Sequence, residues 1–261
     1  TIFRGFRFAM GMAVACAIQN RGKKGESVPQ VIGHVRARTI ALLIMGLFTV
    51  NLESLDTAAT GMPWGLFSFI MVRAFFRIWS VYPNVADWKK YLYTGMKMIG
   101  MLLLVYLFYI YEGRGDSSFS PKWWGILGLI GWTYLVCTFI YLLTRNSIVY
   151  NTIAWIGLVV CSILSSAGVF AGWSFMDYIP SHATLHGFGM AGVCASLIMQ
   201  KYADKQNPNS FILIMCGIGV GMLVAAVIAH QYWIISKLQA TPTWLFYCCA
   251  IFFPLFAFIY W

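Results

Sequence analysis

Acidic side chains are scarce in this sequence, which has eight Asp and Glu residues among 261. Charged residues of both signs make up only 10% of the chain, whereas soluble domains carry roughly a quarter. Hydrophobic residues make up 60%. Because each membrane-spanning helix needs about 20 mostly apolar residues, no room is left for a sizeable soluble domain. The sequence therefore predicts an all-α, polytopic bundle of transmembrane helices.

A CxxC spacing is also absent, although the chain has seven cysteines. They lie almost entirely inside apolar runs, so neither a disulfide framework nor a thiolate metal site is indicated. We interpret them as small apolar packing residues: Cys16, Cys137, Cys161, Cys194, Cys216, Cys248 and Cys249.

A dinucleotide fingerprint is lacking as well. The stretch CGIGVGML contains Gly217, Gly219 and Gly221, but it follows no predicted strand. In an apolar helix, small residues indicate close packing against another helix.

Nine apolar runs predict about nine spanning helices. The second run is short, and it reaches the length of a full span only when Arg36 and Arg38 are included. The runs cover about 4–19, 38–51, 62–82, 91–111, 123–143, 148–171, 183–200, 210–233 and 243–261.

Basic residues gather in alternate loops. With the adjoining Arg38, ten of them lie in one set of loops, at 20–37, 83–90, 144–147 and 201–209. The other set, at 52–61, 112–122, 172–182 and 234–242, holds only three, namely Arg114, Lys122 and Lys237. By the positive-inside rule the first set is cytoplasmic. The net charge of +10 is therefore interpreted as topology and not as a surface for nucleic acid.

Three cations lie inside apolar runs, at Arg73, Arg77 and Lys97. Ionisable groups at membrane depth are costly and usually face a cavity or a partner. Arg73 and Arg77 are four residues apart, so they share a helix face, and two guanidinium groups suit a phosphate or pyrophosphate. Arg77 lies close enough to the predicted cytoplasmic end to extend to the interface instead. With Arg36 and Arg38, these residues predict a cytoplasm-facing pocket for a phosphorylated cofactor.

The stretch YIPSHATLHGFGMAG carries His182 and His186, four residues apart. Ser181 is a good N-cap, which places both rings on one face at the outer start of the seventh span. With Asp177 they are candidate bases on that side, or else two hydrated residues at a capped helix end. A metal or haem site would need a further ligand such as His230, and HxxxH lacks the glutamate of the zinc proteases. We therefore expect no metal.

The stretch PKWWGILGLIGWTYLVC, residues 121–137, resembles the bacterial membrane acyltransferase family related to heparan-α-glucosaminide N-acetyltransferase, in particular its DUF5009 branch. Further stretches agree in order: FAMGMAVACAIQNRGKKGES (8–27), RTIALLIMGLFTVNLE (38–53), SHATLHGFGMAGV (181–193) and WIISKLQATPTW (233–244). The family has roughly eleven helices, each long enough to span. The resemblance thus implies a single transmembrane acyltransferase-like domain over 1–261, incomplete at both ends.

The resemblance implies a reaction as well. The family takes an acetyl group from cytoplasmic acetyl-CoA and delivers it to an amino sugar or related glycan on the outer side, here of the bacterial inner membrane. Arg38 matches an arginine at the start of a family helix and becomes a candidate contact for the CoA phosphates. Asn51 and Lys237 are motif positions near the outer end of the pocket. Among the outer-loop residues, we add Glu53 and Trp173 as candidate contacts to the acceptor.

Two departures from the family pattern concern the first residues. The family's proposed catalytic histidine lies before the segment where this chain begins. Relatives also carry an FPFFLF-like run where this chain has FRGFRF, so Arg4 and Arg7 replace apolar residues near the expected active site. This indicates either an unusual substrate or an imperfect register at this end.

Transport is the main alternative, because broken helices with polar groups at mid-membrane also describe transporters and flippases of small polar or glycan substrates. Acyl transfer to an amine needs a base, an oxyanion donor and a dry cavity. Direct transfer and an acyl-imidazole intermediate both satisfy these needs. The expected partners are membrane lipid, acetyl-CoA and the acceptor, without nucleic acid, and homo-oligomerisation is left open.

Overall fold

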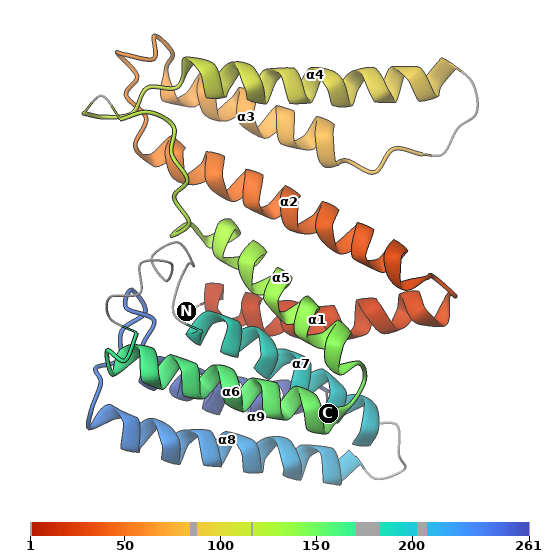
Figure 1. Cartoon of the computed structure of the whole chain (residues 1–261), viewed down its shortest axis with the longest axis vertical. Coiled ribbons are helices and arrows are strands. Elements are labelled where there is room, and N and C mark those ends of the chain that lie inside the picture. Colours follow the sequence, from red (N-terminus) through yellow and green to blue (C-terminus); the bar gives the residue numbers. More distant parts are fainter. Residues whose placement is uncertain (1, 84–87, 116, 171–182, 203–207, 261) are drawn as a thin grey trace. The chain divides into compact units, whose positions relative to one another are not determined.

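The computed structural model describes residues 2–83, 88–115, 117–170, 183–202 and 208–260, and within these ranges the chain is all-α (Figure 1). This confirms the predicted fold class. The helices are α1 (Ile2–Lys23), α2 (Val28–Glu53), α3 (Trp64–Trp79), α4 (Trp88–Ile110), α5 (Ile126–Thr144), α6 (Ile148–Ser166), α7 (Thr184–Tyr202), α8 (Pro208–His230) and α9 (Pro242–Tyr260).

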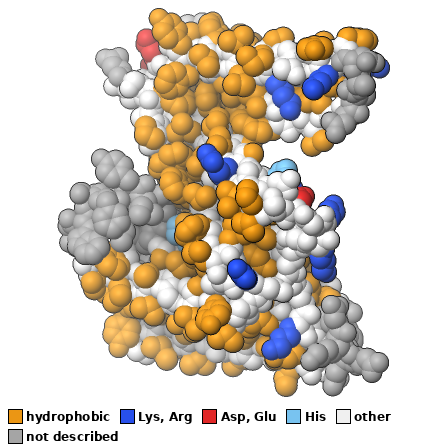
Figure 2. All heavy atoms as spheres, turned by 45° about the vertical axis from the view of Figure 1, so that its right-hand side comes forward, with side chains coloured by type: hydrophobic (Ala, Val, Ile, Leu, Met, Phe, Trp, Pro, Cys, Tyr) orange, Lys and Arg blue, Asp and Glu red, His pale blue; other side chains and the backbone are white. Residues whose placement is uncertain are grey.

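Each predicted apolar run overlaps one of these helices. Six of the helices, α2, α4, α5, α6, α8 and α9, are by themselves long and apolar enough to cross a membrane. Many large hydrophobic side chains face outward, as on α4, where Leu102, Val105 and Phe108 are each at least half exposed. Figure 2 shows hydrophobic side chains over much of the face that it presents. An outer surface of this kind suits lipid and not water, and the chain is a multi-pass membrane protein.

The long loop predicted at 20–37 is wrong, because α1 and α2 leave only a short link between them. The start of α2 carries one half of a capping box, in which Gln30 Oε1 accepts hydrogen bonds from the Ser27 backbone N–H at 2.8 Å and from the Ser27 hydroxyl at 3.1 Å. Val31 and Val35 are buried while the residues between them are exposed. This stretch is an amphipathic helix, which a search for continuous apolar runs does not detect.

The chain forms two compact units, of which the smaller comprises residues 40–128. In it, α3 and α4 pack antiparallel, with the Tyr111 ring against Phe67 at one end and Gly100 against Ala74 at the other. A Cβ at Gly100 would lie 3.1 Å from the Ala74 carbonyl oxygen. The glycine therefore allows the two helices to lie close together.

The larger unit comprises residues 1–39 and 129–261 and is built around α7. Every residue of α7 from Thr184 to Ile198 is buried. Helices α1, α6, α8 and α9 all contact it. The position of α7 at the centre of the unit explains how it can carry small and polar residues instead of a continuous apolar surface.

Candidate functional site

The backbones of α1 and α7 touch at three glycines. A Cβ at Gly11 would lie 1.9 Å from the carbonyl oxygen of Gly189, and a Cβ at Gly192 would lie 2.0 Å from that of Phe8. Real Cβ atoms essentially never approach closer than 3.0 Å. Only glycine fits at these positions, as is common where membrane helices approach closely.

The two helices run parallel. Gly11 lies opposite Gly189, and further along the Cys16 thiol lies 3.3 Å from the Ser196 hydroxyl. Residue numbers therefore rise together in the two helices, with an offset of 178 to 184. By this register, residue 7 of α1 is level with residues 185–191 of α7.

This register brings Arg7 and His186 together. Arg7 is four residues before Gly11 and His186 is three before Gly189, so each lies on the contact face of its helix, one turn from the glycines. Arg7 is 8% exposed and His186 is 5% exposed. The register thus places the two side chains on facing turns of α1 and α7. The expectation of a hydrated histidine at a helix end is therefore wrong for His186.

Neither side chain has a polar partner within the described part of the chain. No carboxylate pairs with the Arg7 guanidinium among these residues, since their ion pairs are those of Glu26 with Arg21 and His34. The Nδ1 atom of His186 likewise has no hydrogen-bond partner there. Buried polar groups are nearly always hydrogen-bonded, so the unpartnered Nδ1 of His186 beside a buried arginine indicates a site for a ligand.

Helix α5 contacts the backbone of α7 at and after His186. The Cys137 thiol donates a hydrogen bond to the His186 carbonyl oxygen at 3.6 Å. A Cβ at Gly189 would lie 2.5 Å from the Cys137 sulfur and 2.7 Å from Thr133 Cγ2. The first turns of α7 are therefore held between α1 and α5, which limits the movement of the imidazole.

The start of α7 is anchored by buried hydroxyl groups. The Thr184 hydroxyl donates a hydrogen bond to the Ala240 carbonyl oxygen at 2.6 Å, and it also contacts the Ser162 hydroxyl of α6. Both side chains are fully buried. These bonds connect α6, α7 and the segment before α9 one turn away from His186.

Three predicted site residues, His182, Asp177 and Trp173, lie outside the described residues. The same holds for the side chain of Arg4. Glu53 of the smaller unit and Lys237 of the larger are both exposed.

Asn51 of the smaller unit is fully buried and bonded within the chain. Its Nδ2 donates to the carbonyl oxygens of Leu47 and Ser120, each at 2.9 Å, and its Oδ1 accepts from the Ser120 N–H at 3.3 Å. These bonds hold the segment between α4 and α5 against α2. The structure thus gives the predicted acceptor contact a clear structural function.

The predicted cofactor residues divide between the units. Arg36 and Arg38 belong to the larger unit and are exposed, and the Arg38 guanidinium carbon lies 5.8 Å from the centre of the Tyr134 ring. The other three predicted cofactor residues, Arg73, Arg77 and Lys97, belong to the smaller unit. A stacked arginine keeps its charge available to an anion.

In the smaller unit, Lys97 and Arg77 meet at Tyr82. The Lys97 ammonium lies 5.5 Å from the centre of the Tyr82 ring, and the Tyr82 hydroxyl donates to the Arg77 carbonyl oxygen at 2.9 Å. Arg73 lies against the Phe69 ring, with its guanidinium carbon 5.4 Å from the ring centre. Arg73 and Lys97 are exposed and Arg77 is half-buried.

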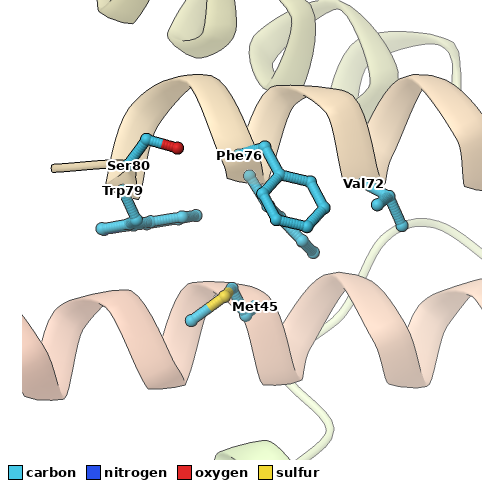
Figure 3. A pocket seen from close by; sticks show the side chains of 6 residues that line it. Met45, Val72, Phe76, Trp79 and Ser80 are labelled. Atoms are coloured by element: carbon cyan, nitrogen blue, oxygen red, sulfur yellow. The ribbon is translucent and has the colours of Figure 1, made fainter. Parts of the chain in front are cut away.

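A cavity of about 410 Å³ lies in the smaller unit between α2 and α3 (Figure 3). Side chains of α3 point across it toward Met45 of α2. Its lining contains no charged group, so it cannot bind the phosphates of a cofactor. The lining residues are Met45, Val72, Phe75, Phe76, Trp79 and Ser80.

A second cavity, of about 370 Å³, lies in the larger unit, at the opposite end of α7 from His186. Gln200 and Lys201 of α7 line it together with Asn146 and Ser147, at the start of α6. The first backbone N–H groups of a helix and a lysine both attract anions. Sequence reasoning placed Lys201 and Arg145 in one set of loops but did not bring the α5–α6 turn next to α7.

No group of three His, Cys, Asp or Glu side chains placed to hold a metal occurs in the part of the chain that the structure describes. From the sequence, His186 is a candidate base, whereas Arg7 is only a departure from the family pattern. The spacing of Arg7 to Gly11 is visible in the sequence, whereas the partner of Gly11 is not. Comparisons with protein-family models, with curated proteins and with solved structures find no match to this chain.

Proposed function

We propose that this protein is a membrane-embedded acyltransferase, which moves an acetyl group from acetyl-CoA on the cytoplasmic side to an amino sugar or related glycan acceptor on the outer side. The observation that carries the proposal is the buried His186, whose Nδ1 is free of described partners beside a buried Arg7. The choice of reaction rests on the sequence stretches that resemble the acyltransferase family and occur in the same order along the chain. The bacterial inner membrane and the cytoplasmic position of the basic loops belong to the same proposal.

His186 is the base in this proposal. The amine nitrogen of the acceptor attacks the thioester carbonyl carbon, and the carbon–sulfur bond breaks. The imidazole takes the proton that the amine nitrogen loses and returns a proton to the departing CoA sulfur. General base catalysis of this kind contributes about 10²- to 10⁴-fold, and the surrounding helices keep water away from the thioester.

The acyl donor approaches from the other end of α7. Lys201, Gln200 and the start of α6 line a polar cavity there, which suits the CoA phosphates. Arg38, in the same unit, is a second candidate for these phosphates. Lys201 is fifteen residues after His186, which is about 22 Å along a helix. An extended pantetheine arm must cover this distance for the thioester to reach the imidazole.

Formation of acetylated product tests the proposal. The purified protein in lipid nanodiscs is given acetyl-CoA and a panel of amino sugars, and the products are measured by mass spectrometry. We expect His186→Gln to lower the rate by at least about 100-fold, while His230→Gln, at the exposed end of α8, keeps it.

Arg38→Ala is expected to raise the KM for acetyl-CoA and to leave that for the acceptor unchanged. Absence of acetylated product with every acceptor would contradict acyl transfer. Uptake of an unmodified sugar into proteoliposomes would then support transport.

A further inference from the structure

The buried guanidinium of Arg7 lacks a countercharge among the described residues. Arg7 is 8% exposed, and the ion pairs among the described residues do not include it. An unpaired charge removed from water is costly, and proteins normally supply a partner or a ligand. Buried ionisable groups among apolar helices usually face a cavity or a partner, so Arg7 indicates a functional site.

Extension of the side chain into water does not explain Arg7. It lies five residues after the start of α1, or about 8 Å along the helix. Arginines that reach the interface keep the charged group exposed, whereas Arg7 is 8% exposed. A ligand would reach this charge at the contact face between α1 and α7.

The charge at this face determines the class of partner. Arg7 carries one permanent positive charge. On the α7 side of this face lie His186 and, against Gly189, Thr133 and Cys137 of α5, none of which is permanently charged. A carboxylate carries a single negative charge and fits the guanidinium with two parallel hydrogen bonds. A phosphate monoester carries about −1.5 to −2, which would leave excess negative charge buried in a medium of low dielectric constant. The site therefore favours a carboxylate.

We infer that Arg7 binds a carboxylate group of the acceptor, and hence that the acceptor is an acidic amino sugar, which carries a carboxylate near its amine. This inference rests on the proposed acyl transfer, in which the bound ligand is the acceptor. A carboxylate on Arg7 places the rest of the ligand beside His186, where the amine loses its proton. Arg7 is thus the residue that selects the substrate, and His186 is the base.

Binding tests the carboxylate site without any catalysis. The protein in nanodiscs is titrated with glucuronate or with glucose, its neutral counterpart, and the midpoint of thermal unfolding is followed. We expect glucuronate to raise the midpoint and glucose not to raise it, since a ligand stabilises the state that it binds. Decanoate and decanol form a second pair, which detects a carboxylate that comes from lipid.

Arg7→Gln is the central variant, with Arg114→Gln, at an exposed loop position, as its matched control. A charge-assisted hydrogen bond is worth enough to change Kd on the order of 10- to 100-fold, so Arg7→Gln should weaken glucuronate binding by that factor. The ligand-free variant should unfold at the same temperature as the wild type or a higher one, because it removes an unpaired buried charge. Arg7→Lys keeps the charge but loses the two parallel N–H donors of the guanidinium group, so we expect an intermediate affinity for glucuronate.

Acetylation of 2-amino-2-deoxyglucuronate and of glucosamine completes the test. We expect the acidic sugar to be preferred in kcat/KM by about 10- to 100-fold, and Arg7→Gln to abolish the preference. Equal effects of glucuronate and glucose on stability would overturn the inference, as would equal acetylation of the two amino sugars. Glucuronate binding that depends on Arg7, without acetylation of any amine, would instead refute the acyl transfer and leave the carboxylate site standing. Binding of decanoate alone would overturn the acidic sugar in favour of a lipid carboxylate.

Discussion

Gly11→Ala is the substitution that most directly tests the contact between α1 and α7. The added Cβ would lie 1.9 Å from the Gly189 carbonyl oxygen and 2.8 Å from its carbonyl carbon. Ordinary van der Waals contact begins at 3.4 Å, so the helices would have to separate by about 1.5 Å. The atoms that obstruct the Cβ belong to the backbone of a helix buried on all sides, which has no side-chain rotamer to change.

The expected cost follows from this geometry. Added atoms in a packed interior cost about 1–3 kcal/mol, and a gap of about 0.5–1 Å already removes a quarter to a half of the attraction between facing atoms. We therefore expect Gly11→Ala to destabilise the protein by about 3 kcal/mol. For a chain of this size that lowers the unfolding midpoint on the order of 6–12 °C.

Gly221→Ala is the matched control in the same unit. A Cβ there meets nothing within 4 Å, so the gain in helix propensity should stabilise the protein by up to about 1 kcal/mol. Unfolding is followed with a thiol-reactive fluorophore, because Cys137, Cys194 and Cys249 are buried in the larger unit. If Gly11→Ala and Gly221→Ala unfolded at the same temperature, the close approach of α1 and α7 would be refuted.

Two further substitutions test the buried polar groups that position the helices. Asn51→Ala removes the hydrogen bonds that hold the segment before α5, so we expect a loss of about 3 kcal/mol and faster proteolysis in that segment. Asn20→Ala, at an exposed position of α1, should change the stability by less than about 0.5 kcal/mol, and equal losses would contradict this function of Asn51. Thr184→Val keeps the shape of the side chain but leaves the Ala240 carbonyl oxygen without its hydroxyl donor, and should cost about 1–3 kcal/mol in thermal unfolding. Thr94→Val, exposed on α4, should have little effect.

The helices could be predicted because lipid selects for apolar segments of a fixed length. Every predicted run overlaps one helix, and most boundaries fall within three residues of the prediction. The apolar runs do not predict the start of α2, because Val31 and Val35 are buried on one face only, while the intervening residues are exposed. Such a stretch is recognised by its period and not by its mean hydropathy.

The glycines show why the site was harder to predict. The chain has 24 of them, and close packing was expected at Gly217, Gly219 and Gly221. Only Gly219 of these three meets a neighbour, with its Cβ position 2.6 Å from Pro254 Cγ. Which glycine supports a contact depends on the arrangement of helices that are far apart in sequence. For the same reason the proximity of Arg7 to His186 could not be inferred from the residues alone.

Formation of acetylated amino sugar by the wild type and by His186→Gln is the most direct test of the central claim. The imidazole of His186 is buried, its Nδ1 has no partner among the described residues, and Arg7 lies beside it. The account predicts product with the wild type and with His230→Gln, and a rate at least about 100-fold lower with His186→Gln. An unchanged rate with His186→Gln would contradict the account.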